Sequence, residues 1–122
     1  MSKDLQQVWE TYAAAWKAAT ADEKARALQA SVDAAAVYCD PLVEARGYAA
    51  IVEYMLDFHR QVPGGYFITT KFWSHHQRSI ANWNMCSADG TVIGHGVSYG
   101  AYDTAGKLTT MTGFFDVPSA AT

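Results

Sequence analysis

Asp40 is the side chain whose type and position best suit proton transfer in this sequence. It stands directly before Pro41. A carboxylate in such a place often bonds to nearby backbone and fixes a turn, and the residues alone favour this structural role. If the carboxylate also borders an apolar pocket, desolvation disfavours its charged form and makes it a better base. Both roles stay open at this point.

The other side chains of catalytic type form no complete motif. His75 and His76 fall where two strands are expected to turn, and His95 stands alone. This spacing fits no zinc site, so we expect no metal. His76 shares strand parity with Ile68 and Phe72, which keeps it as a candidate for a pocket wall. We find no convincing Ser-His-Asp order, glycine-rich phosphate loop or supported Cys-His pair.

The composition indicates one globular domain over residues 1–122. Half of the 122 residues are hydrophobic, 17% are charged and the net charge is -3, which suits a folded domain. Without a basic cluster, we expect neither nucleic acid nor an anionic membrane as a partner. The first ten residues lack the apolar segment of a signal peptide. Cys39 and Cys86 lie far apart, so we expect reduced thiols and a cytoplasmic location.

The first half of the chain is predicted to form three helices. Apolar residues recur every three or four positions over residues 5–16, as in an amphipathic helix. Tyr12 lies in this stripe, where most tyrosines fill the core. Thr20 and Glu23 match a capping box that opens a second helix. A third helix follows Gly47 and is stopped by the Pro-Gly-Gly sequence at residues 63–65.

The second half of the chain is predicted to form a meander of strands. Asp89-Gly90 is a strong hairpin signal between two of them. The expected strands, with a short earlier one first, cover residues 36–39, 66–74, 79–87, 91–102 and 107–117. Helices followed by strands indicate an α+β fold. We expect a cone-shaped α+β barrel, with three helices packed on a curved antiparallel sheet of cystatin-like topology.

The two faces of the predicted sheet differ in character. Gly94, Gly96 and Gly100 share one face of a strand and leave volume that a core would normally fill. A cavity, a closely packed helix or a sheet bend would each explain them. The opposite face is too apolar for open solvent, so we expect a symmetric sheet-to-sheet homodimer. Its expected residues are Val97, Tyr99 and Phe114, with Trp73 and Phe67 as further candidates.

The order of elements resembles the nuclear transport factor 2-like superfamily, which includes SnoaL-like cyclases and ketosteroid isomerase. The resemblance spans nearly the whole chain and is more specific for fold than for chemistry. It is carried by Tyr38-Cys39-Asp40-Pro41, by Gly47 before Ile51, Tyr54 and Phe58, by Gly90 in its hairpin, and by residues 102–108 with Met111 and Phe115.

The resemblance implies roles for individual residues. Asp40 matches the general base of the isomerase branch, and Tyr12 matches the helix tyrosine that donates to an enolate oxygen. Ser98 takes the place of a second, protonated aspartate, and this departure argues against steroid isomerase activity because a hydroxyl is not an acid held neutral by its surroundings. The expected ligand-binding residues are Trp16, Phe58, Phe72, His76, Trp83, Ser98, Met111 and Phe115.

Two functions therefore remain open from the sequence. The first is a cofactor-free proton-transfer enzyme, such as an isomerase, dehydratase or cyclase, acting on a small apolar carbonyl compound. Asp40 would shuttle the proton, and Tyr12 and Ser98 would donate to the developing oxyanion. The alternative is non-catalytic binding of a small apolar molecule, or a dimerisation module. The same glycines and aromatic residues would serve both.

Overall fold

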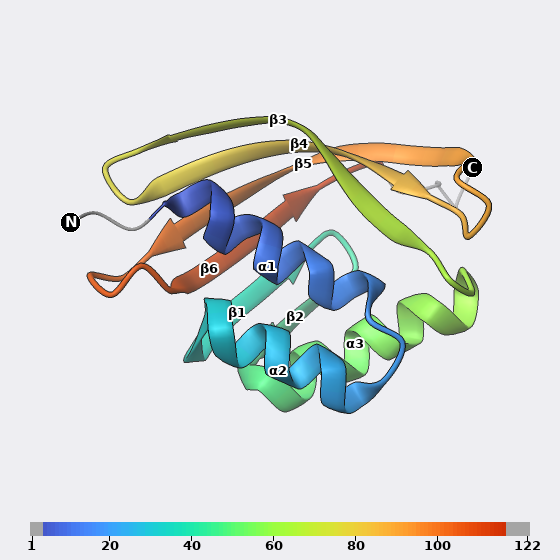
Figure 1. The fold of residues 1–122 in the computed structure, drawn as a ribbon, viewed down its shortest axis with the longest axis horizontal. Helices are drawn as coiled ribbons and strands as arrows, with labels where there is room; N and C mark the ends of the chain where they lie inside the picture. Colours follow the sequence, from blue (N-terminus) through green and yellow to red (C-terminus); the bar gives the residue numbers. More distant parts are fainter. Residues whose placement is uncertain (1–3, 117–122) are drawn as a thin grey trace.

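Three helices pack against one face of a six-stranded sheet in the computed structural model, which describes residues 4–116 (Figure 1). In chain order the elements are α1 (Leu5–Lys17), α2 (Ala21–Ser31), β1 (Val32–Asp40), β2 (Val43–Arg46), α3 (Gly47–Gln61), β3 (Tyr66–His75), β4 (Arg78–Cys86), β5 (Val92–Tyr102) and β6 (Leu108–Phe114). The predicted α+β fold class is confirmed. The end of the last expected strand, Val117, lies outside the described residues.

The helices begin where local side chains cap them. Asp4 accepts hydrogen bonds from the first backbone N–H groups of α1. Thr20 and Glu23 form the complete capping box of α2, as predicted. Gly47, with φ of +81°, adopts the left-handed conformation that opens α3. Within residues 4–116, no helix is both long enough and apolar enough to cross a bilayer.

Lys24 joins the helices from inside. Its side chain is fully buried, and its ammonium group donates to the carbonyl oxygens of Ala15 at 3.1 Å and Ala18 at 2.6 Å. These carbonyls belong to the last turn of α1, which lacks intrahelical donors. On the other side the ammonium group lies 3.4 Å from His59 Nδ1 of α3. One residue of α2 thereby holds the relative positions of α1 and α3.

The sheet is mixed and curved, and it does not close into a barrel. Its strand order is β2-β1-β6-β5-β4-β3, with β1 parallel to β6 and every other pair antiparallel. The parallel pair and the strand β2 were not predicted. The alanine-rich start of β1 carries a helical propensity that hides the strand. Four residues, Val43–Arg46, are too few to show a periodicity.

A register shift in β3 changes which side chains face the helices. Ile68 pairs with Asn84, whereas Phe72 pairs with Ala81, and the shift falls between Thr69 and Lys71. Ile68 is exposed, and Phe72 packs against the core. The parity that grouped Ile68 with Phe72 and His76 therefore does not hold, because an extra residue in a strand reverses its faces.

The glycines of β5 are explained in different ways along the strand. A Cβ at Gly100 would lie 3.4 Å from the ring of Trp9, so α1 packs closely there. A Cβ at Gly96 would lie 2.6 Å from Cη2 of Trp83, whose ring covers the strand at that point. Gly94 instead borders an open cavity. Close packing and a cavity, which the sequence left as alternatives, therefore occur side by side.

Candidate functional site

A cavity of about 500 Å³ lies between the helices and the inner face of the sheet. The helices α1 and α3, the end of β1 with the turn after it, the strands β3 to β5 and the two residues after β6 supply its wall. Most of the large side chains in this wall are aromatic, which gives an apolar lining with few polar groups. They are Trp9, Tyr12, Trp16, Tyr38, Tyr54, Phe58, Phe67, Trp83 and Phe115.

Trp16 of α1 is the centre of the aromatic lining. Its ring centroid lies 5.7 Å from that of Tyr38, 5.9 Å from that of Tyr54 and 5.4 Å from that of Phe67. Most of these contacts are edge-to-face or tilted, the arrangements that aromatic quadrupoles favour. The cluster fixes the wall of the cavity without filling it.

Asp40 is held in this wall by four hydrogen-bond donors. Its side chain is 8% exposed. Oδ2 accepts from the hydroxyls of Tyr38 at 2.6 Å and Tyr54 at 2.8 Å, and Oδ1 accepts from the backbone N–H groups of Leu42 and Val43. This donor set fits an ionised carboxylate, which can only accept. The turn role and the cavity position, treated as alternatives in the sequence, are therefore combined in one residue.

The two tyrosines on Asp40 keep their protons far into the alkaline range. Burial is the main cause that raises the pKa of Tyr38, followed by the neighbouring Tyr12 and Asp40. Burial also raises the pKa of Tyr54, and the hydrogen bond to Asp40 adds to the effect. Both hydroxyls therefore remain donors at neutral pH.

Two further hydroxyls in the cavity each accept a hydrogen bond from an indole. Trp16 Nε1 donates to Tyr12 Oη at 3.1 Å, and Trp83 Nε1 donates to Ser98 Oγ at 3.0 Å. No side chain or backbone group of residues 4–116 accepts the hydroxyl protons of Tyr12 and Ser98 in turn. Both hydroxyls border the cavity and can donate to a bound molecule.

Gly113 of β6 is a buried residue that lies between the polar groups. A Cβ at this position would lie 3.6 Å from Asp40 Cβ, 3.6 Å from Ser98 Oγ and 3.9 Å from Tyr38 Oη. These are ordinary van der Waals distances. The missing side chain of Gly113 therefore lets Asp40 and the Ser98 hydroxyl approach the same point of the strand from two sides.

The structure brings together most of the residues that the sequence proposed for the site. The cavity wall contains Tyr12, Trp16, Asp40, Phe58, Trp83, Ser98 and Phe115. Three proposed residues lie elsewhere. Phe72 packs against the core, and Met111, on β6, is a core residue that is 1% exposed. His76 is exposed in the β3–β4 turn, where its φ is +48°.

Tyr38 and Tyr54 line the cavity and bond Asp40, and the sequence did not single them out as site residues. Tyr38 precedes Asp40 by two residues and therefore shares its strand face. Tyr54 precedes Phe58 by four residues and shares its helix face. These two spacings are the signals that could have found them.

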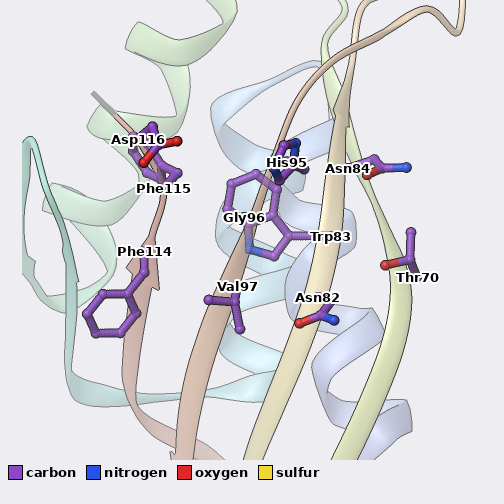
Figure 2. A pocket seen from close by; sticks show the side chains of 10 residues that line it. All are labelled: Thr70, Asn82, Trp83, Asn84, His95, Gly96, Val97, Phe114, Phe115 and Asp116. Carbon is purple, nitrogen blue, oxygen red and sulfur yellow. The ribbon is translucent and has the colours of Figure 1, made fainter. Parts of the chain in front are cut away.

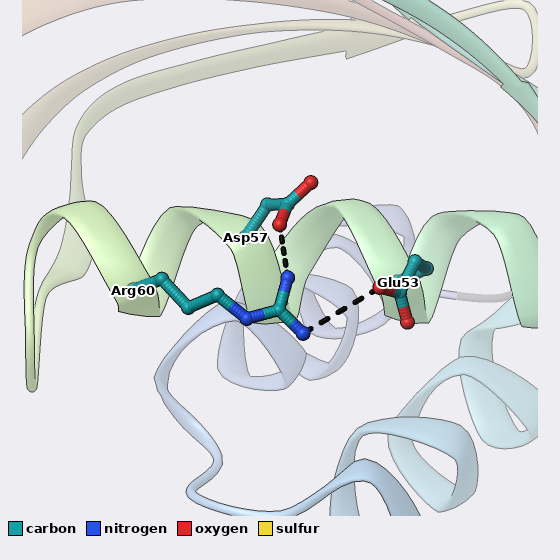
Figure 3. A network of polar contacts seen from close by, with 3 residues as sticks. All are labelled: Glu53, Asp57 and Arg60. Atoms are coloured by element: carbon teal, nitrogen blue, oxygen red, sulfur yellow. Dashed lines mark hydrogen bonds and ion pairs between the residues drawn. The ribbon is translucent and has the colours of Figure 1, made fainter.

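The rim of the cavity carries a small ion-pair network on α3 (Figure 3). Arg60 pairs with Asp57 and, at 3.5 Å, with Glu53. Asp57 also borders the cavity. In the described part of the chain, no three His, Cys, Asp or Glu side chains are grouped so that they could hold a metal ion.

A second hollow, of about 610 Å³, lies on the outer face of the sheet (Figure 2). Thr70, Asn82, Asn84 and Val97 border it, and Phe114 stands at its edge. Its wall has none of the buried hydroxyl–carboxylate contacts of the inner cavity, so the inner cavity is the better candidate site.

The comparisons with known proteins place the fold and no more. No protein-family model and no curated protein matches the chain. Solved structures match over most of its length. A SnoaL-like family protein from Agrobacterium tumefaciens, described as a candidate isomerase, has a TM-score of 0.84 at 22% identity, covering 92% of this chain and 97% of that one.

Two further solved structures agree with this match. TerC, co-crystallised with polyporic acid, has a TM-score of 0.75 at 15% identity, covering 93% of this chain and 92% of its own. A candidate polyketide cyclase from Sinorhizobium meliloti has a TM-score of 0.70 at 10% identity, covering 88% and 93%. The chain therefore has the cystatin-like, nuclear transport factor 2-like fold, as its sequence motifs predicted. Fold alone does not assign chemistry.

Proposed function

We propose that this protein binds a small, largely apolar carbonyl compound in the inner cavity and moves a proton on it with Asp40, without a cofactor. The observation that carries the proposal is that Asp40 and the hydroxyls of Tyr12 and Ser98, whose protons are unused within the site, border the same cavity. A carbonyl compound seated there has an acidic C–H group beside a carboxylate and its oxygen near a hydroxyl donor. General base catalysis needs this proximity.

The proposed reaction has two proton transfers. Asp40 accepts a proton from the carbon beside the carbonyl group, the C–H electron pair forms the enolate, and the negative charge moves to oxygen. The hydroxyl protons of Tyr12 and Ser98, which are unused within the site, stabilise that oxyanion. Asp40 then returns the proton to another carbon, which isomerises the substrate, or to a leaving group.

Tyr38 and Tyr54 have a positioning role in this mechanism. Their hydroxyls hold Oδ2 of Asp40 at 2.6 and 2.8 Å and fix the direction of the carboxylate. The aromatic wall limits access of water to the enolate. Solved structures of the same fold that are described as a candidate isomerase and a candidate polyketide cyclase support chemistry of this class.

The test is exchange of carbon-bound hydrogen with deuterated water. The wild-type protein is incubated with a panel of aryl ketones and diones, and the exchange rate is followed by proton NMR. We expect Asp40→Asn to lower the rate by roughly 10²–10⁴-fold, the usual contribution of a general base. Glu44→Gln, which removes an exposed carboxylate outside the cavity, is the control. Equal exchange in the folded Asp40→Asn variant and the wild type would show that Asp40 is not the base.

One observation favours the alternative function of binding without catalysis. Four donors already occupy the oxygens of Asp40, and a carboxylate satisfied in this way has less need of a substrate proton. The same panel decides between the two functions. A ligand that raises the melting temperature but undergoes no exchange in the wild type would identify a binding protein.

A further inference from the structure

The charged side chains around the inner cavity all have the same sign. Asp40, Asp57 and Asp116 border the cavity, and no Lys or Arg among residues 4–116 does so. His95, an exposed residue on β5, contributes an imidazole to the wall. The distribution is therefore one-sided, although the whole chain has a net charge of only -3.

Three cations of the helices have partners of their own. Arg60 is held by Glu53 and Asp57 on the surface of α3 (Figure 3), so the charge of Asp57 is already balanced. Lys24 is directed at the carbonyl oxygens that end α1. Lys17 lies over the ring of Tyr66, 4.9 Å from its centroid.

Asp40 is therefore left with neutral partners. It forms no ion pair within the described residues, and its four donors are two hydroxyls and two backbone N–H groups. These bonds satisfy its lone pairs but leave its charge in place. Buried carboxylates usually have a cationic partner, and since no cation among residues 4–116 fills this role, an occupant of the cavity can supply it.

The aromatic wall suits the same kind of occupant. The ring centroids of Tyr38 and Tyr54 lie 5.6 Å apart, and both rings contact Trp16. The faces of such rings carry partial negative charge and attract ammonium groups, most of all where water is excluded.

We propose that the inner cavity selects a substrate that carries a positive charge, namely a tertiary or quaternary amine that also bears a carbonyl group. The inference rests on the proposed function in taking this cavity as the substrate site, and it adds the charge class of the substrate. A positive charge near the reacting carbon would also stabilise the carbanion that forms when Asp40 removes a proton. Carboxylate-bearing compounds would be repelled.

The charge preference can be measured by binding alone. Acetylcholine carries a carbonyl group and a trimethylammonium group, and in its neutral isostere a tert-butyl group replaces the trimethylammonium group. Levulinate carries a carbonyl group and a carboxylate. Each is titrated into the full chain, and the indole N–H signals of Trp16 and Trp83 are followed by NMR. We expect acetylcholine to bind about tenfold more tightly than the isostere, and levulinate to bind most weakly.

Two charge-neutralising variants separate a local effect from a general one. Asp40→Asn should reduce the preference for acetylcholine over the isostere to about twofold or less, since the carboxylate that attracts the cation is gone. Glu44→Gln changes the net charge equally but lies outside the cavity, so it should keep the preference. A third variant, Phe58→Leu, keeps an apolar wall without a ring face and should lower affinity for the cation more than for the isostere.

The outcomes distinguish this inference from the proposed function. The charge preference is overturned if acetylcholine and its isostere bind equally or if levulinate binds most tightly. It is also overturned if Asp40→Asn and Glu44→Gln lose the preference for acetylcholine to the same extent. In each case the cavity remains a binding site. Failure of every compound to shift either indole signal would remove the site itself. Hydrogen exchange in Asp40→Asn is measured separately. Its loss tests catalysis by Asp40 and does not depend on the charge of the bound compound.

Discussion

At the scale of single residues, the buried tyrosines determine how the protein responds to alkali. Burial raises the pKa of Tyr12, Tyr38 and Tyr54. Burial, partly offset by a hydrogen bond with Ser79, raises the pKa of Tyr102 from 10.0 to about 12. These shifts mean that the folded chain keeps protons which the unfolded chain loses near pH 10.

Stability should therefore be complete below pH 10 and should fall as pH rises from 10 toward 12. Tyr102 alone would contribute a loss of roughly 2–3 kcal/mol across this window. Thermal unfolding followed by circular dichroism at increasing pH measures the fall, and near-ultraviolet absorbance reports tyrosinate. Tyr102→Phe should make the fall less steep. A melting temperature that stays constant up to pH 12 would contradict the prediction.

The site could be predicted in part at this scale because periodicity assigns side chains to faces. Asp40, Tyr12 and Trp16 lie on the cavity wall as expected. His76 does not, because it lies in the β3–β4 turn beyond the end of the strand. The register shift after Thr69, which puts Ile68 and Phe72 on opposite faces of β3, was not predicted either. That shift has no signature in the sequence, since its residues are ordinary strand formers. It also turns Phe67 into the cavity, although the outer face was expected.

At the scale of elements, Lys24 is the residue on which the helix arrangement depends most. Lys24→Met keeps the length of this fully buried side chain but removes the donor to the carbonyl oxygens of Ala15 and Ala18 at the end of α1. We expect the free energy of unfolding to fall by about 1–3 kcal/mol. Part of this cost is offset, because burial lowers the pKa of Lys24 and its charge is held there unfavourably.

Chemical denaturation of Lys24→Met, with Arg26→Met as the control, measures this effect. Arg26→Met changes an exposed cation on the same helix and should alter the free energy of unfolding by less than about 0.5 kcal/mol. Similar losses in the two variants would mean that the contacts of Lys24 with α1 contribute little.

The helices were easier to predict than the sheet, for a physical reason. Helix caps and helix breaks are local signals. Thr20, Glu23 and Gly47 therefore predict where helices begin from a few neighbouring residues. The parallel pairing of β1 with β6 places Tyr38 opposite Met111. It therefore joins segments that lie about 70 residues apart in the chain. Such a long-range pairing depends on the whole fold, and no local spacing specifies it.

At the scale of the whole molecule, the outer face of the sheet leaves several large apolar side chains uncovered. Trp73 pairs with Ile80, which pairs with Tyr99, and Val97 pairs with Phe114 on the neighbouring strand. Trp73 is 45% exposed and Phe114 57% exposed. The residues thus form one continuous patch beside the hollow of Figure 2, whereas the helices cover the opposite face (Figure 1).

We propose that two copies of this chain pair through the outer face, because a patch of this kind usually marks an interface and two-fold pairing is the commonest way to cover it. Val97→Glu places a charge in the patch, and we expect it to shift a dimer to a monomer in sedimentation velocity at micromolar concentration. Ala49→Glu adds the same charge on the exposed side of α3 and should leave the dimer intact. If the unmodified chain sediments as a monomer, the patch has another role. If both variants dissociate it, the interface lies elsewhere.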